Sequence, residues 1–352
     1  MSLLHRGSRH DLYVMPESPR PDNTMTKPTS HVVPELTAWR ERHPGRLPDA
    51  HLETRINKES RKAARLGVAD LNTPPAPTLI ATTIRLALAL TGLRQRAVDN
   101  ACRIEMNIEE WHLKNLSTDF DGFRLLQISD PHFGADPAID DAIIEQLGGI
   151  EHDLCVLTGD YRYRSAGPST AALDGLRRLR EVVEGDILAL LGNHDSINTL
   201  PAIEAMGIDV LLNESRTLRR GDAALHFVGV DDPNFFRTDD LPRALEHRDL
   251  CESEHAATVC LAHAPELAEE AAQHGCDLFL TGHTHGGQIC LPGRIPILRN
   301  SRAPYARLSG RWQVQTMQGY TSRGCGVSVA PARFFCPPEI TIHVLRSSSA
   351  PS

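Results

Sequence analysis

The chain has 352 residues, of which 41% are hydrophobic and 23% charged, and its formal net charge is −8 at pH 7. These values are close to the average of soluble globular proteins, so they exclude wholesale disorder and a membrane-embedded bundle. The negative charge also argues against broad nucleic-acid binding, which needs an excess of lysine and arginine. The eight cysteines include no Cys-x-x-Cys pair, which predicts reduced core thiols and a cytoplasmic protein.

The N-terminal part of the chain is predicted to lie outside the catalytic domain. Residues 1–33 are polar and rich in proline, without the apolar core of a signal peptide, and predict a flexible tail. Residues 34–97 are predicted to form a helical accessory segment. Its stretch 78–92 is largely apolar but contains Arg85 and is shorter than the ~20 residues that span a bilayer. We expect this stretch to pack on the main domain, with a peripheral membrane contact as the alternative.

From residue 98 to residue 346, short apolar runs alternate with amphipathic stretches. Strands are predicted over residues 124–128, 154–158, 187–191, 224–230, 257–262 and 278–281, and helices near residues 138–148, 169–183, 240–248 and 265–273. This alternation favours an α/β fold for the catalytic domain. Residues 312–345 are expected to add further strands, and residues 347–352 to fray.

Polar residues directly follow five of the predicted strands. The clusters are Asp130-x-His132, Gly159-Asp160, Gly192-Asn193-His194-Asp195, His263 and Gly282-His283-x-His285. Open α/β sheets bind their ligands at the carboxyl ends of the strands. We therefore expect these side chains to converge on one site.

The clusters offer carboxylate, amide and imidazole groups, a mixed set that suits manganese, iron, zinc or a similar divalent ion. Residues i and i+2 of an extended segment point to the same side, so Asp130 and His132 can bind one ion. His283 and His285 repeat this spacing, and the whole set is too large for a single ion. Each motif alone is common in ordinary loops, but the occurrence of all five in order after strands argues against a purely structural role.

This ordered set of motifs resembles the calcineurin-like metallophosphoesterase superfamily over residues 100–345. The resemblance implies a four-layer α/β/β/α sandwich with two divalent ions, to which this chain adds an N-terminal helical extension. One ion would be held by Asp130, His132, Asp160 and His285. Asp160 would bridge to the second ion, whose site would be completed by Asn193, His263 and His283. His194 would face the substrate, held by Asp195 or by a backbone carbonyl.

Within the superfamily, Gly286-Gly287-Gln288 and residues 322–326 and 338–340 resemble a bacterial phosphodiesterase branch, whose members often carry an N-terminal membrane anchor or export signal. This chain differs in its long polar N-terminus and in the run Tyr161-Arg162-Tyr163-Arg164. Two alternatives are open for the side chains of Arg162, Arg164 and Arg323. They bind substrate phosphates, or they are solvated charges on loops.

The leading hypothesis is a hydrolase of phosphodiesters, phosphomonoesters or pyrophosphates, in which a hydroxide that bridges the two ions attacks phosphorus. His194 would stabilise the transition state or protonate the leaving oxygen. The branch resemblance favours phosphodiester or lipid-linked substrates, and we expect a phosphorylated small molecule or a lipid-linked compound as the substrate. The alternatives are a catalytically degraded metal-binding scaffold of the same fold and an oxygen-activating iron enzyme, which would not require a second metal. The sequence leaves the oligomeric state open.

Overall fold

The structure is a computed structural model that describes residues 34–68, 75–246 and 256–348. The tail predicted over residues 1–33 lies outside the described residues, as do most of the predicted frayed end and the last part of the helix predicted near residues 240–248. The α-helices are α1 (Pro34–Arg42), α2 (Asp49–Arg65), α3 (Leu79–Leu90), α4 (Arg94–Ala101), α5 (Pro137–Leu147), α6 (Thr170–Val182), α7 (Leu200–Glu204), α8 (Leu241–Glu246) and α9 (Ala268–Gln273).

Six of the strands match the predicted runs to within two residues. The strands are β1 (Glu105–Leu113), β2 (Phe123–Ile128), β3 (Leu154–Leu157), β4 (Ile187–Ala189), β5 (Asp209–Val210), β6 (Glu214–Arg220), β7 (Ala223–Gly229), β8 (Ala256–Leu261), β9 (Leu278–Thr281), β10 (Cys290–Leu291), β11 (Ile295–Pro296), β12 (Gly310–Val314), β13 (Met317–Thr321) and β14 (Glu339–Ser347). Of these, β1, β5, β6 and the short pair β10 and β11 were not expected. Short 3-10 turns occur at Thr118–Phe120, Ile197–Thr199, Pro265–Leu267, His285–Gly287 and Tyr305–Arg307.

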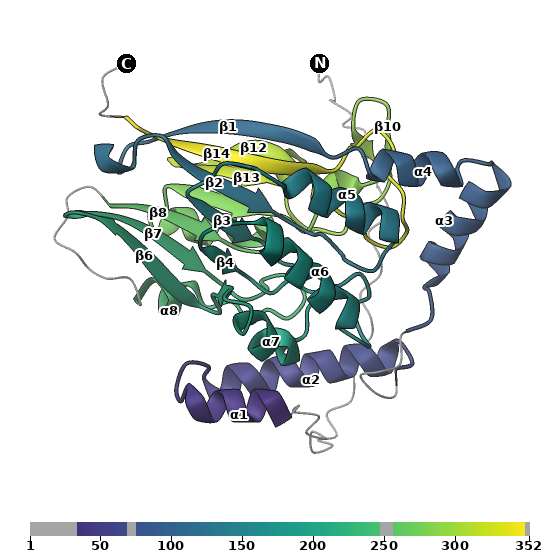
Figure 1. Ribbon diagram of the computed structural model, residues 1–352, viewed down its shortest axis with the longest axis horizontal. Coiled ribbons are helices and arrows are strands. Elements are labelled where there is room, and N and C mark those ends of the chain that lie inside the picture. Colours follow the sequence, from purple (N-terminus) through teal and green to yellow (C-terminus); the bar gives the residue numbers. More distant parts are fainter. Residues whose placement is uncertain (1–33, 69–74, 247–255, 349–352) are drawn as a thin grey trace, which may run out of the picture. The chain divides into compact units, whose positions relative to one another are not determined.

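The longer strands form two six-stranded sheets (Figure 1). The first sheet has the order β1-β14-β2-β3-β4-β5, and the second has the order β12-β13-β9-β8-β7-β6. Strands β2 to β5 run parallel, and so do β7, β8, β9 and β13. Their carboxyl ends therefore lie together at one edge of each sheet, the position that the polar clusters require.

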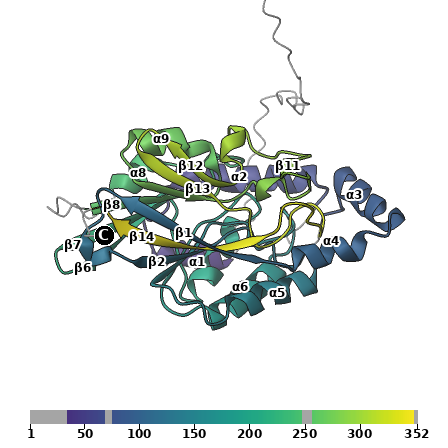
Figure 2. The same cartoon turned by 90° about the horizontal axis from the view of Figure 1, so that it is seen from above.

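Three apolar cores separate the layers of the fold. On β2, Leu126 packs with Ile143 of α5 and Leu176 of α6, while the adjacent Leu125 faces Phe227 of the second sheet, as the two-residue period of a strand requires. The outer face of the second sheet packs on α8 and α9. Figure 2 shows α5 and α6 on one side of the paired sheets and α8 and α9 on the other. This confirms the expected four-layer α/β/β/α sandwich.

The N-terminal segment contains α1, α2 and α3. Helix α4 crosses the boundary expected between residues 97 and 98. The division of the chain into an accessory segment and a catalytic domain therefore stays a prediction. In α1, Trp39 donates a hydrogen bond from Nε1 to Glu204 of α7 at 2.6 Å. In α3, Ala81 is buried, but Leu79 is 83% and Leu90 is 79% exposed. None of the described helices is both long and apolar enough to cross a bilayer.

Candidate metal centre

The predicted ligands lie on tight turns at the strand ends. Five of them adopt positive φ angles, namely Asp130 (52°), His132 (47°), Asp160 (60°), His283 (69°) and His285 (51°). This left-handed conformation costs a residue with a Cβ roughly 1–3 kcal/mol, and residues strained in this way cluster at functional sites. The surrounding sheets therefore hold these side chains in a strained arrangement.

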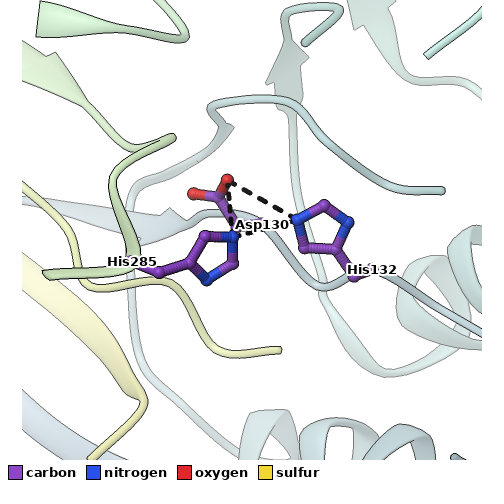
Figure 3. A group of neighbouring side chains, drawn as sticks. All are labelled: Asp130, His132 and His285. Atoms are coloured by element: carbon purple, nitrogen blue, oxygen red, sulfur yellow. Dashed lines mark hydrogen bonds and ion pairs between the residues drawn. The ribbon is translucent and has the colours of Figure 1, made fainter. Parts of the chain in front are cut away.

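The first group of ligands comes from both sheets (Figure 3). Asp130 and His132 follow β2, and His285 follows β9. The Nε2 atoms of His132 and His285 lie 3.0 Å apart, and Asp130 Oδ1 lies 3.6 Å from His285 Nε2 and 4.0 Å from His132 Nε2. His132 Nδ1 lies 3.0 Å from the Arg162 carbonyl, which can only accept a hydrogen bond. His132 therefore presents the lone pair of Nε2 to the group.

Asp160 lies between this group and a second one. Its Oδ2 is 3.6 Å from His132 Nε2, and its Oδ1 is 3.4 Å from His263 Nε2. His263 Nε2 is in turn 3.0 Å from Asn193 Oδ1. The ligand atoms of Asp160, His263 and His283 lie within 4.8 Å of one another. The two oxygens of one carboxylate thus face two different sets of ligands.

The second group, with the shared Asp160, has the chemistry that a divalent cation needs. Burial would lower the pKa of His263, but the Asp160 carboxylate raises it to about 10, which indicates a potential that attracts positive charge. Burial would likewise raise the pKa of Asp160, yet His263, His194 and His132 hold it well below its usual range. Nδ1 of His283 is buried and makes no hydrogen bond with any described residue. An ion would satisfy this nitrogen, so the residues fit the metal set that the sequence predicted.

His194 and Asp195 lie beside Asp160 and differ in role, and the ring of His194 also lies 4.7 Å from that of His132. Nδ1 of His194 is 3.0 Å from the Tyr163 carbonyl, and its backbone N–H donates to Asp160 Oδ1 at 2.7 Å. Burial, with His132 and Lys62 nearby, holds the pKa of His194 well below its usual range against the opposing effect of Asp160. The imidazole is therefore neutral and is held by a backbone carbonyl.

The Asp195 carboxylate binds backbone N–H groups and not the His194 ring. It accepts hydrogen bonds from the backbone N–H groups of Asp160 (2.8 Å), Tyr161 (2.9 Å), Arg162 (3.2 Å) and Gly192 (2.8 Å). Burial and the Asp160 charge raise its pKa, although the hydrogen bond from Gly192 opposes that effect. Asp195 thus joins the turn after β3 to the turn after β4.

The sequence left two alternatives for Arg162, Arg164 and Arg323. In the structure, all three contact other residues of the same chain. Arg162 donates to the carbonyls of His194 and Gly167, both at 2.8 Å. Arg164 donates to the Pro75 carbonyl at 2.5 Å, and Arg323 pairs with Glu339 and, at 2.9 Å, with Glu105. These contacts stabilise loops around the centre.

Other residues at the centre were missed by the sequence analysis. Asn234 contacts His283 Nε2 through its side-chain amide, and it follows β7 as the predicted clusters follow their strands, so that pattern could have found it. Arg55 and Lys62 of α2 donate to the carbonyls of Gly192 (3.2 Å) and Asn193 (2.6 Å). These two lie in a charged helix, where no spacing distinguishes them from solvated residues.

Comparisons with known proteins agree with this geometry. The sequence model of the family described as calcineurin-like phosphoesterase matches residues 123–287. Over 244 residues the chain is 30% identical to a Bacillus subtilis protein named "Uncharacterized metallophosphoesterase YkuE", covering 65% of this chain and 81% of that protein. It is 29% identical to "Phosphodiesterase YaeI" of Escherichia coli over 62% of this chain and 81% of that protein. A Bos taurus "Transmembrane protein with metallophosphoesterase domain" is 28% identical over 78% of this chain and 63% of its own length.

Proposed function

The chain belongs to the calcineurin-like phosphoesterase family of metal-dependent hydrolases that act on phosphate esters, and we propose that it does so with a pair of divalent ions. The observation that carries this proposal is the position of Asp160, whose Oδ2 faces His132 and whose Oδ1 faces His263. A carboxylate shared in this way is the feature that a two-metal site needs and a single-metal site does not.

In this proposal, seven residues provide the ligands. Asp130, His132, Asp160 and His285 would hold one ion, and Asp160, Asn193, His263 and His283 the other. Manganese, iron and zinc all suit this set of ligands. Bound ions of this kind polarise phosphoryl oxygens and lower the pKa of water.

His194 would transfer a proton to the leaving oxygen of the ester. Because the Tyr163 carbonyl can only accept, the proton of the neutral ring lies on Nδ1, and Nε2 carries a lone pair. Nε2 can therefore take up a proton from solvent water and pass it to the leaving oxygen of the ester. The backbone N–H of His194, bonded to Asp160 Oδ1, keeps the ring next to that carboxylate.

For the substrate, we propose a small phosphorylated or lipid-linked ester, hydrolysed in the cytoplasm and in part at the membrane surface. The seven cysteines among the described residues are free thiols, which supports a reducing compartment. The exposed leucines of α3, next to Arg85 and without an acidic residue in that helix, support a peripheral membrane contact.

The test is hydrolysis of bis-p-nitrophenyl phosphate and p-nitrophenyl phosphate by full-length protein stripped of metal and resupplied with Mn²⁺. We expect metal-dependent turnover that Asp160→Asn abolishes and that His194→Ala lowers by roughly 10²–10⁴-fold. Asp174→Asn, an equivalent change at a side chain 69% exposed on α6, should leave turnover intact. Bound metal without turnover would favour the scaffold, whereas metal-dependent oxygen consumption would favour the iron enzyme. Turnover that survives Asp160→Asn would contradict the two-metal proposal.

A further inference from the structure

Helix α2 lies outside the residues that match the family model, yet it contacts two loops of the centre. The contacts come from Arg55, Glu59 and Lys62, whose spacing of four and three residues places them on one face of the helix. One loop, residues 192–197, carries Asn193 and His194. The other, residues 231–236, carries Asn234 and Phe235.

Arg55 and Glu59 bind the first loop through charged hydrogen bonds. The fully buried Arg55 guanidinium donates to the carbonyls of Gly192 (3.2 Å) and Asp195 (3.1 Å) and pairs with the carboxylate of Asp231. Glu59 accepts from the Ser196 hydroxyl at 2.6 Å and from the Ile197 backbone N–H at 2.8 Å. Because each bond is directional, together they fix the position of the loop relative to α2.

Lys62 lies at the end of this face that is next to the metal ligands. Its Nζ donates to the Asn193 carbonyl at 2.6 Å, while the Asn193 side chain meets His263. On the other side, Nζ lies 4.4 Å from the centre of the Phe235 ring, and Phe235 is 39% exposed. The preceding residue, Asn234, contacts His283. The ammonium therefore lies between two ligand-bearing loops, and the Lys62 side chain is partly exposed to solvent.

The charge of Lys62 is available to a ligand, unlike that of the neighbouring arginines. Arg162 and the fully buried Arg333 direct most of their hydrogen bonds to backbone carbonyls, and Arg333 also donates to His285 Nδ1 at 3.2 Å. An ammonium has three N–H donors, and one of them is used by the Asn193 carbonyl. The remaining donors can bind an anion that approaches the ions from solvent.

We propose that Lys62 binds the phosphate group of the substrate. Arg55 and Glu59 are then positioning residues, which hold the loop of residues 192–197 next to Lys62. This proposal rests on the proposed function, because it needs a phosphate bound at the ions. It also makes α2 part of the catalytic centre, although it precedes the matched family region.

The experiment measures binding of inorganic phosphate to full-length protein loaded with Mn²⁺ by calorimetry, and Mn²⁺ affinity without phosphate by electron paramagnetic resonance. Lys62→Met should weaken phosphate binding about tenfold or more, as expected for loss of a hydrogen bond to a charged group, and leave Mn²⁺ affinity unchanged. Lys62→Arg should restore most of the phosphate affinity. Arg61→Met, the same loss of charge at an exposed position of α2, should change neither constant.

Two outcomes would overturn the proposal. The first is unchanged phosphate affinity in Lys62→Met at saturating Mn²⁺ together with weaker Mn²⁺ binding, which would mean that Lys62 only holds Asn193. The second is failure of Lys62→Arg, folded as judged by its thermal unfolding, to recover phosphate binding. Since neither measurement requires turnover, an inactive wild-type protein that binds phosphate through Lys62 would contradict the proposed reaction and not this inference. In an active protein, Lys62→Met should raise KM more than it lowers kcat.

Discussion

Helices α2 and α3 belong to the same N-terminal segment, but their relation to solvent is the reverse of what their composition suggests. The charged helix α2 places Arg55 at 0% exposure against the loops of the centre, whereas the apolar helix α3 leaves Leu79 and Leu90 mostly exposed. Burying a guanidinium costs several kcal/mol unless it is paired and fully hydrogen-bonded, and Arg55 finds its partners in carbonyls and carboxylates. Hydrogen-bonding partners, and not hydropathy, decide which helix joins the main body.

The largest effect in this comparison is expected from Arg55→Ala. The substitution leaves the Asp231 carboxylate buried without its main cationic partner, so the free energy of unfolding should fall by about 3–5 kcal/mol. Urea unfolding followed by circular dichroism measures this change. Arg61→Ala, at an exposed position of the same helix, should stay within about 0.5 kcal/mol of wild type. Equal effects of the two substitutions would mean that α2 is not held by its buried face.

A smaller effect is expected from acid. Burial alone would raise the pKa of Asp231, but Arg55 and His51 hold it well below its usual range. A carboxyl group with a lowered folded-state pKa stabilises the fold above its unfolded value of about 3.9, and this contribution is lost as the pH falls towards the folded value. The stability difference between wild type and Asp231→Asn should therefore be constant near neutral pH and shrink below about pH 4. Parallel urea titrations from pH 7 to pH 3 test this, and an unchanged difference would contradict it.

The smallest effect on stability is expected in α3. Replacing the exposed Leu86 and Leu90 by serine should change the free energy of unfolding by no more than about 0.5 kcal/mol per site. The same pair of substitutions should reduce flotation of the protein with vesicles that contain anionic lipid, if α3 contacts membranes. A loss of 2 kcal/mol or more would show instead that these leucines are packed, and would remove the contrast with α2.

The strands that carry the ligands could be predicted because they are buried on both faces and read as continuous apolar runs. The missed strands β1 and β6 are at the edges of the two sheets, and their sequences, Glu105–Leu113 and Glu214–Arg220, are largely polar and partly exposed. An edge strand with solvent on one side carries no such run. The polar pattern after the strands found the seven candidate ligands, but it did not show that five of them take left-handed conformations themselves.

The residues that hold the loops of the centre through hydrogen bonds could not be predicted, for a different reason. The sequence analysis predicted either Asp195 or a backbone carbonyl as the hydrogen-bond partner of His194. In the structure the partner is the Tyr163 carbonyl, a backbone group that every residue carries. Arg55 and Lys62 are also recognisable only by the carbonyls that they meet, more than 130 residues away in the chain. Such contacts depend on the path of the backbone, which a residue pattern does not specify.

The place of β14 in the first sheet has a consequence for the biosynthesis of the protein. This strand, Glu339–Ser347, pairs with β1 on one side and β2 on the other, so the sheet cannot close until residue 347 has left the ribosome. Translation proceeds at about 5–20 residues per second, and during that time β1 and β2 lack the strand that joins them. Asp130 follows β2 directly, and Cys325 and Gly326 donate backbone hydrogen bonds to the carbonyls of Ser129 and Asp130. The catalytic centre is therefore completed only after β14 has left the ribosome, and a nascent chain would be held inactive until then.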